Sequence, residues 1–297
     1  ATAGSRAVGP PPGPSVKIEI VPAHKADLPA IERFLVKEWP EYMAQSPDEP
    51  MRERNWLPGN ESFGVRLLAD GELAGYLGAS YSLRPVEGRL ERFCAIAPWF
   101  VKEEHRSHSL KMLFKLLADK DMTYVNYTPS RPMFKLFTGL GFAKLDEAKL
   151  LILPLLNLPW LRPGRGRLIT DPSKVRDALT GDDLKIFDDH VGTRCRHLAI
   201  VDGDRVCYIA AGRRILRKAT FSEILHLSEP ALLAPQIERI VWLLCRHFRA
   251  VGVAADERLL AGATVRTIRY RLNSPPVFKS KHLNRTQIDN MWGELAF

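Results

Sequence analysis

Apolar and polar positions alternate at residues 16–21, VKIEIV, and this alternation predicts a strand with one buried face. The period then changes, because Leu28, Ile31 and Phe34 recur at helical spacing. We therefore expect a helix that ends near Trp39, just before a proline.

Two further alternating runs, residues 63–68 and 73–83, are separated by a turn at Gly71, which is typical of a β-hairpin. A third run, residues 89–101, contains Pro98 in its interior. Proline cannot donate a ladder hydrogen bond, so this run is expected to carry a bulge or an unpaired edge.

Residues 97–117 pass from an apolar strand through a charged turn into a helix, predicted at 107–118. Such a junction leaves the first helical N–H groups unpaired, with the positive end of the helix dipole behind them, and is suited to binding a phosphate. The apolar stripe expected to bury this helix comprises Leu110, Leu113, Leu116 and Leu117. A strand at 123–127, a helix at 130–140 and a strand at 142–153 follow.

The second half repeats this order of elements after a linker rich in Pro and Gly. Its expected elements are a helix at 173–179, a hairpin of 197–200 with 206–211, a strand at 222–227, a helix at 234–248, a strand at 250–254 and a short amphipathic helix at 286–297. The expected organisation is a flexible leader at 1–15, a first domain at 16–153, a linker at 154–168 and a second domain at 169–297.

Composition narrows the class of protein. The 297 residues are 45% hydrophobic, and no apolar run suggests a membrane span, so two soluble globular domains are expected. A net charge of +9 favours anionic partners, but the basic residues are scattered and form no block typical of nucleic-acid tails. Four cysteines without C-x-x-C spacing indicate reduced thiols in a cytoplasmic protein.

The charged turn contains a recognisable motif. Arg106-x-x-Ser109-x-Lys111, after a strand ending at Val101, resembles the pyrophosphate loop Arg/Gln-x-x-Gly-x-Gly/Ala of the GNAT superfamily of acyl-CoA N-acyltransferases. Ser109 stands in place of the first glycine and Lys111 in place of the second glycine or alanine. Glycine allows a phosphate to approach the backbone closely, so Lys111 either crowds the site or supplies a charge.

A second motif follows in the expected order. Ser130 and the Leu136-Phe137-x-x-x-Gly141-Phe142 run resemble the GNAT signature Asn-x-x-Ala-x-x-Leu-Tyr-x-x-x-Gly-Phe. Phe137 replaces the tyrosine that often protonates the departing thiolate in this family, and phenylalanine cannot donate a proton.

The resemblance implies an α/β (α+β) fold of two tandem GNAT-like domains, each a mixed, mostly antiparallel sheet flanked by helices. The second domain is expected to be degenerate, because its junction carries Glu229 and no pyrophosphate motif. We do not expect CoA to bind there.

The resemblance also implies a donor site for acetyl-CoA or another acyl-CoA. The implied donor-binding residues are Phe100, Val101, Arg106, Ser107, His108, Ser109, Leu110, Lys111 and Ser130. The pantetheine arm is expected in a gap where the bulged strand splays from its neighbour.

Proton transfer and acceptor binding have their own candidates. Glu91 is the candidate general base, because an amine acceptor must lose a proton before it attacks a thioester, but a solvated surface charge explains it equally well. Tyr127 is the candidate acid, and Tyr81 and Asn126 are candidate acceptor-site residues or simply walls of the cleft. His105 and His108 are residues of a type that binds metals, but the sequence offers no third ligand beside them, so no metal is expected.

The sequence thus favours an N-acyltransferase that moves an acetyl or other acyl group from acyl-CoA to an amine of a small-molecule acceptor, acting as a monomer or homodimer. Two alternatives stay open. One is a non-catalytic acyl-CoA-binding or scaffold protein, and the other is a Fem-like transferase that uses aminoacyl-tRNA.

Overall fold

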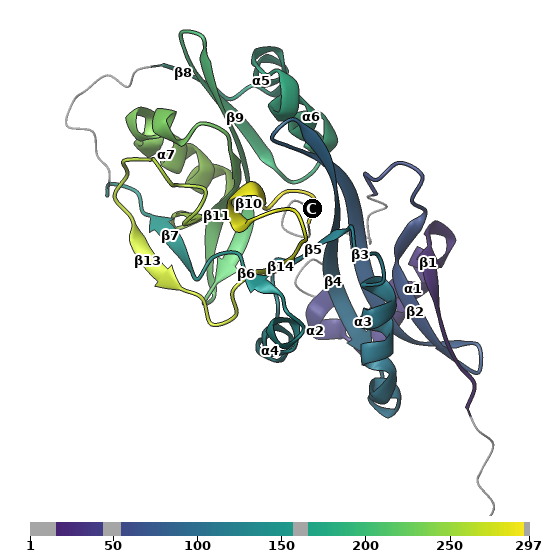
Figure 1. The fold of residues 1–297 in the computed structure, drawn as a ribbon. Coiled ribbons are helices and arrows are strands. Elements are labelled where there is room, and N and C mark those ends of the chain that lie inside the picture. The colour runs from purple at the N-terminus through teal and green to yellow at the C-terminus, as the bar shows by residue number, and fades with distance from the viewer. Residues whose placement is uncertain (1–15, 44–54, 157–165, 294–297) are drawn as a thin grey trace, which may run out of the picture.

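The computed structural model of the chain describes residues 16–43, 55–156 and 166–293. The expected leader at 1–15 and most of the expected linker lie outside these residues. The described chain forms two seven-stranded sheets flanked by helices (Figure 1). The predicted α/β class, with mixed and mostly antiparallel sheets, is confirmed.

The first sheet has the strand order β1-β2-β3-β4-β5-β14-β6, and only its β4–β5 pair is parallel. Its strands are β1 (Ile18–His24), β2 (Ser62–Ala69), β3 (Glu72–Val86), β4 (Arg89–Val101), β5 (Thr123–Asn126), β6 (Ala143–Lys144) and β14 (Val277–Lys279). Its helices are α1 (Leu28–Glu38), α2 (Pro40–Met43), α3 (Ser109–Leu116) and α4 (Arg131–Gly139), with 3-10 turns η1 (Lys25–Asp27) and η2 (Glu103–His108).

The second sheet has the order β13-β7-β12-β11-β10-β9-β8, and its β11–β12 pair is likewise parallel. Its strands are β7 (Ala148–Ile152), β8 (Arg167–Ile169), β9 (Arg196–Asp202), β10 (Arg205–Leu216), β11 (Ala219–Leu227), β12 (Val253–Asp256) and β13 (Ile268–Arg271). Its helices are α5 (Pro172–Ala178), α6 (Gly181–His190) and α7 (Ile237–Phe248), with 3-10 turns η3 (Pro230–Leu232), η4 (Ala234–Gln236) and η5 (Arg285–Gln287).

Two strands are exchanged between the sheets. β7 pairs with β12 and β13 in the second sheet, and β14 pairs with β5 and β6 in the first. Figure 1 shows the teal strand β7 beside the yellow β13, and the yellow β14 beside β5 and β6. The single strand expected at 142–153 is therefore wrong: the chain leaves the first sheet after Lys144 and enters the second at Ala148.

The expected helix at 286–297 is also wrong within the described residues. The segment forms the single turn η5, after which Ile288 is extended. The residues that follow bond to groups on both halves of the molecule instead of to their own backbone. Tertiary partners have overridden the helical spacing of the apolar residues in this segment.

Helices cover both faces of each sheet. Buried side chains of α3 and α4 join one core of the first sheet, while α1 packs with Tyr76 and Phe100 on its other face. In the second sheet, α7 covers one face, and α5 and α6 cover the other. Leu113, Leu116 and Leu117 are buried as predicted, but Leu110 is 44% exposed and lies outside the buried stripe.

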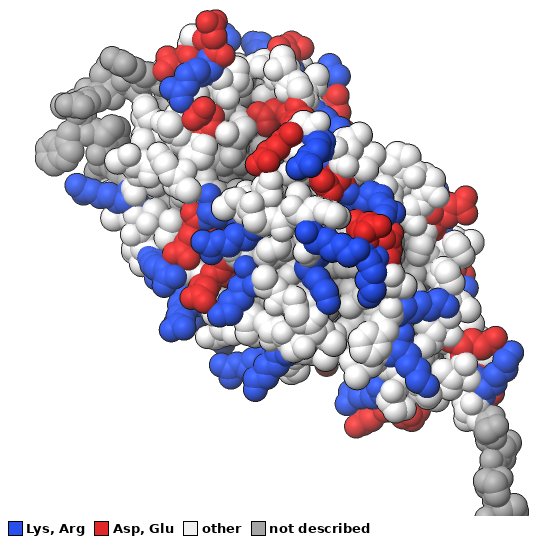
Figure 2. Space-filling view, viewed as in Figure 1, with Lys and Arg blue, Asp and Glu red and all other residues white. Residues whose placement is uncertain are grey.

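The surface of the molecule carries mixed charge. On the face shown in Figure 2, Lys and Arg are spread over both halves and interspersed with Asp and Glu. None of the described helices combines the length and the apolar character needed to cross a membrane.

The expected irregularity at Pro98 is a β-bulge in β4. Leu77 of β3 pairs with Trp99 and Ala79 pairs with Ile96, so Ala97 and Pro98 together face Gly78. A Cβ atom on Gly78 would lie 2.6 Å from the carbonyl oxygen of Ala97. The bulge therefore requires glycine on the neighbouring strand.

We predict that Gly78→Ala destabilises the protein by about 1–3 kcal/mol, because the new methyl group collides with the bulged backbone. Denaturant unfolding monitored by circular dichroism measures this change. Gly139→Ala is the matched control, since a Cβ there meets nothing within 4 Å and the stability is expected to change little. An equal effect of the two substitutions would contradict the role of Gly78.

Candidate active site

The first sheet opens next to the bulge. β4 and β5 pair in parallel only from Phe93 with Thr123 to Ala95 with Val125. β4 then continues to Val101, and in the described chain its partner in the sheet over that stretch is β3. The parallel pairing therefore stops at Ala95, and β5 itself ends at Asn126. The place where β4 continues past the end of β5, with the bulge at Ala97 and Pro98, is called the gap below.

The predicted pyrophosphate loop lies where β4 ends and α3 begins. Residues 103–108 are wound into the 3-10 turn η2, and α3 starts at Ser109. The N–H of Ser109 donates to the carbonyl oxygen of Arg106, and that of His105 donates to Lys102 at 3.0 Å. These two N–H groups are committed within the turn, so a bound anion depends on the remaining N–H groups and on side chains.

The side chains of this loop are largely accessible. The Arg106 side chain is 66% exposed and lies 3.7 Å from Glu103. Because both side chains are exposed, this ion pair constrains Arg106 only weakly. Ser107, Leu110 and Lys111 are exposed, and His108 and Ser109 are half-buried. The Nδ1 atom of His108 is buried and has no hydrogen-bond partner in the described part of the chain, so a bound polar group could satisfy it.

Three other predicted donor-site residues are placed differently. Phe100 packs under α1, with its ring 5.6 Å from that of Trp39, so it lies on the face of the sheet opposite α3. Val101 is buried in the core beneath α3. Ser130 is the exposed N-cap of α4 and makes no side-chain capping bond.

Glu91 and Tyr81 differ in their distance from the gap. Tyr81 pairs with Cys94, one residue before the β4–β5 pairing ends, whereas Glu91 is farther away. Glu91 lies six residues before Ala97, which corresponds to about 20 Å along an extended strand. It lines a surface hollow with Arg89 and Lys281 among other residues. Tyr81 lines a second hollow of about 470 Å³ at the far end of α3, and burial raises the pKa of its hydroxyl.

Tyr127 and Asn126 lie at the end of β5, beside the gap. The Tyr127 hydroxyl donates to the carbonyl oxygen of Asp289 at 2.9 Å and accepts from Arg84 Nη1 at 3.1 Å. Burial raises the pKa of this phenol. Asn126 accepts a hydrogen bond from the N–H of Thr128 and shapes the turn after β5.

Phe137 is core rather than cleft. It is 0% exposed, and its ring lies 4.8 Å from that of Phe142. No proton donor therefore stands at the position of the family's tyrosine, and Tyr127 is the tyrosine that the structure places beside the gap.

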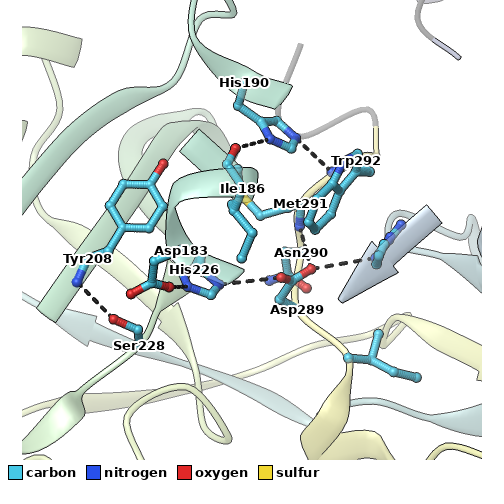
Figure 3. A network of polar contacts seen from close by, with 12 residues as sticks. Asp183, Ile186, His190, Tyr208, His226, Ser228, Asp289, Asn290, Met291 and Trp292 are labelled. Carbon is cyan, nitrogen blue, oxygen red and sulfur yellow. Dashed lines mark hydrogen bonds and ion pairs between the residues drawn. The ribbon is translucent and has the colours of Figure 1, made fainter. Parts of the chain in front are cut away.

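A buried polar network, which sequence patterns did not reveal, joins the two halves behind this site (Figure 3). His226 of β11 lies between two carboxylates, with Nε2 3.0 Å from Asp183 and Nδ1 3.3 Å from Asp289. Asp289 also lies 3.5 Å from Arg84, which is 2% exposed. A charged residue inside the apolar alternation of β3 was the only signal for Arg84.

The network fixes the protonation of its histidines. Burial alone would lower the pKa of His226, but hydrogen bonds to Asp183 and Asp289 outweigh burial and raise this pKa to about 9. His190 is different, because burial lowers its pKa to about 3. Its Nδ1 lies 2.8 Å from the carbonyl oxygen of Ile186, and its Nε2 accepts from the N–H of Trp292 at 3.2 Å, as a neutral ring can.

Solved structures that align with most of the chain include proteins described as N-acyltransferases or N-acetyltransferases. A conserved protein of unknown function from Enterococcus faecalis, described as a probable N-acyltransferase, aligns with a TM-score of 0.54 at 11% identity over 92% of this chain and 74% of its own. A GCN5-related N-acetyltransferase from Anabaena variabilis aligns with a TM-score of 0.51 at 10% identity, over 89% of this chain and 72% of its own. One from Kribbella flavida aligns with a TM-score of 0.50 at 12% identity, over 89% of this chain and 71% of its own. The chain therefore shares the fold of these proteins across both of its sheets, as the resemblance to the GNAT superfamily implied.

Sequence comparison adds nothing to this assignment. No protein-family model matches the chain, and no curated protein matches it.

We predict a pH-dependent contribution of His226 to stability. Its pKa in the folded protein, about 9, exceeds the ordinary value of 6.5. The stabilisation, up to about 3 kcal/mol, is therefore fully present below pH 6.5 and is lost as the pH rises to 9. The free energy of unfolding, measured in urea from pH 6 to 9.5, should fall as the pH rises in the wild type. This slope should disappear in His226→Gln.

The exposed His282→Gln is the control and should retain the wild-type slope. Parallel curves for wild type and His226→Gln across this range would contradict the charged state assigned to His226.

Proposed function

We propose that the chain is an acyl-CoA-dependent N-acyltransferase that moves an acetyl or other acyl group to the amine of a small-molecule acceptor. The observation that carries the proposal is that the parallel pairing of β4 with β5 stops at Ala95, directly before the bulge at Ala97 and Pro98. A bulge re-aims backbone groups out of the ladder, and an N–H freed there can polarise a thioester carbonyl. The shared fold supports the same reaction class.

The donor would lie along this gap with its pyrophosphate at the start of α3. Arg106 and Lys111 supply positive charge there, and His108 offers a buried ring nitrogen without a partner in the described chain. Two glutamates, Glu103 and Glu104, precede the arginine. Arg106 would thus exchange its exposed partner Glu103 for a phosphate, which binds guanidinium more strongly.

In a direct transfer, the acceptor amine must lose a proton and the departing CoA thiolate must gain one. The deprotonated acceptor amine adds to the thioester carbonyl, the carbon–sulfur bond breaks, and the acyl group leaves on nitrogen while CoA departs as a thiol. Tyr127 follows the last residue of β5 and is the candidate to protonate the thiolate. Glu91 stands about 20 Å along β4 from the bulge, so it would act only through a relay of water molecules.

One set of observations favours a second candidate function. Phe137 is core, and the Tyr127 hydroxyl already bonds Arg84 and Asp289. A protein that binds acyl-CoA without transferring the acyl group would not need either side chain as a proton donor. Release of CoA thiol in the presence of amines separates the enzyme from this alternative.

We predict that the chain binds acetyl-CoA or a longer acyl-CoA and that Arg106→Ala weakens this binding about tenfold or more, because a charge-assisted hydrogen bond to phosphate is lost. Isothermal titration calorimetry measures the dissociation constants. Arg246→Ala, an exposed arginine on α7, is the matched control and should bind like the wild type. Absence of binding to every acyl-CoA would overturn the proposal.

We predict that Tyr127→Phe lowers kcat for CoA release about 100-fold with little change in donor affinity, as expected for a lost general acid. Because the hydroxyl bridges Arg84 and Asp289, unfolding stability must be measured in parallel. A loss of stability with an unchanged kcat would assign Tyr127 a purely structural role.

A further inference from the structure

The second sheet contains its own version of the gap. β11 and β12 pair in parallel from Ser222 with Val253 to Ile224 with Ala255. The next residue, Leu225, is bulged, because Ala211 of β10 pairs with Ile224 whereas Ala210 pairs with His226. A short parallel pair followed by a bulge is thus repeated in both halves, although no pyrophosphate motif precedes α7.

Residues 288–292 lie in this second gap. The N–H of Asn290 donates to the carbonyl oxygen of the bulged Leu225 at 3.1 Å, which attaches the segment to β11. The Asn290 side chain donates to Asp256, the last residue of β12, at 2.6 Å. The segment therefore bridges the two strands where they diverge.

Arg258 holds the segment from the β12 side. Its guanidinium donates to the side-chain oxygen of Asn290 and to the carbonyl oxygen of Ile288, both at 2.7 Å. The same guanidinium pairs with Asp146 and Asp256, which are themselves buried. Asn290 thus adds neutral hydrogen bonds to a buried cluster in which Arg258 and Lys149 already pair with carboxylates.

The other side of the segment contacts Tyr127 of the first half and α6 of the second half. Asp289 accepts from Tyr127 through its carbonyl oxygen, and a Cβ on Gly293 would lie 2.4 Å from the Tyr127 ring. Trp292 donates to His190 through its N–H and to Asp189 through its indole nitrogen, at 3.2 and 3.0 Å. Asn290, Met291 and Trp292 are all at most 1% exposed.

We propose that residues 288–292 form a strap that closes the second gap and opens as a unit, separately from the sheets. The strap occupies the place that the donor's arm takes in the first half, an equivalence that rests on the proposed function. It therefore leaves one donor site per chain and holds Tyr127 in position through Asp289. The second gap is closed by residues 288–292 of the same chain, although β11 and β12 keep the short parallel pair and the bulge.

Hydrogen–deuterium exchange of the full chain with peptide resolution tests the strap. Asn290→Ala removes the bonds to Asp256 and Arg258. It should accelerate exchange at least tenfold in residues 288–293, together with residues 222–227 and 253–258, while β2 and β3 keep wild-type rates. Asn284→Ala is the matched control, because this asparagine caps the exposed turn η5 and does not reach the gap.

Faster exchange confined to residues 288–293 would overturn the strap, since the gap would then be closed without it. Should Asn290→Ala unfold, exchange of the wild type in mild denaturant decides the question. The strap and the gap residues must open together before β2 and β3, and opening only with global unfolding would overturn the proposal. Exchange needs no acyl-CoA, so failure of the donor to bind contradicts the proposed function and leaves this result standing.

Discussion

The exchange of two short strands is the constraint on which the arrangement of both halves depends. Without β14, β5 would expose its hydrogen-bonding edge and β6 would lose its partner, and without β7 the second sheet would end at β12. Unpaired strand edges are costly and prone to aggregate, so neither half completes its sheet alone. The chain connection between β6 and β7 and the return through β14 therefore tie the two halves into one structure.

The return through β14 also determines what happens at the centre of the molecule. It delivers residues 288–293 between the halves, where Asp289 meets His226 of the second sheet and Arg84 of the first. The β4–β5 pairing of the first half ends beside the candidate donor site, whereas residues 288–292 bond to both β11 and Asp256 of β12 in the second half. On our proposals, one half of a repeated arrangement would bind the donor and the other would be closed by the chain itself.

Patterns among neighbouring residues predicted those elements whose structure depends only on such neighbours. The alternation of β1 to β4, the helical spacing of α3 and α4 and the bulge at Pro98 all follow from neighbours in the sequence. The splay of β4 from β5 came only through the resemblance to a known loop. Sheet membership could not be predicted, because β7 and β14 are three to five residues long and their partners lie more than 100 residues away.

The candidate site was predicted unevenly for the same reason. Arg106 and its neighbours lie between β4 and α3, the junction that the sequence predicted, because the motif is contiguous. Glu91 and Tyr81 were grouped with the cleft by strand order alone; the length of β4 separates Glu91 from the bulge, whereas Tyr81 pairs with Cys94 near it. Arg84, His226 and Asp289 come together only in three dimensions, and no spacing in the sequence connects them.

A crystal structure of the chain with a non-hydrolysable acyl-CoA analogue tests the central claim most directly. The account predicts one analogue per chain, with its pyrophosphate at Arg106 and Lys111, its arm between β4 and β5, and residues 288–292 still seated between β11 and β12. An analogue bound between β11 and β12, or away from the β4–β5 gap, would contradict it.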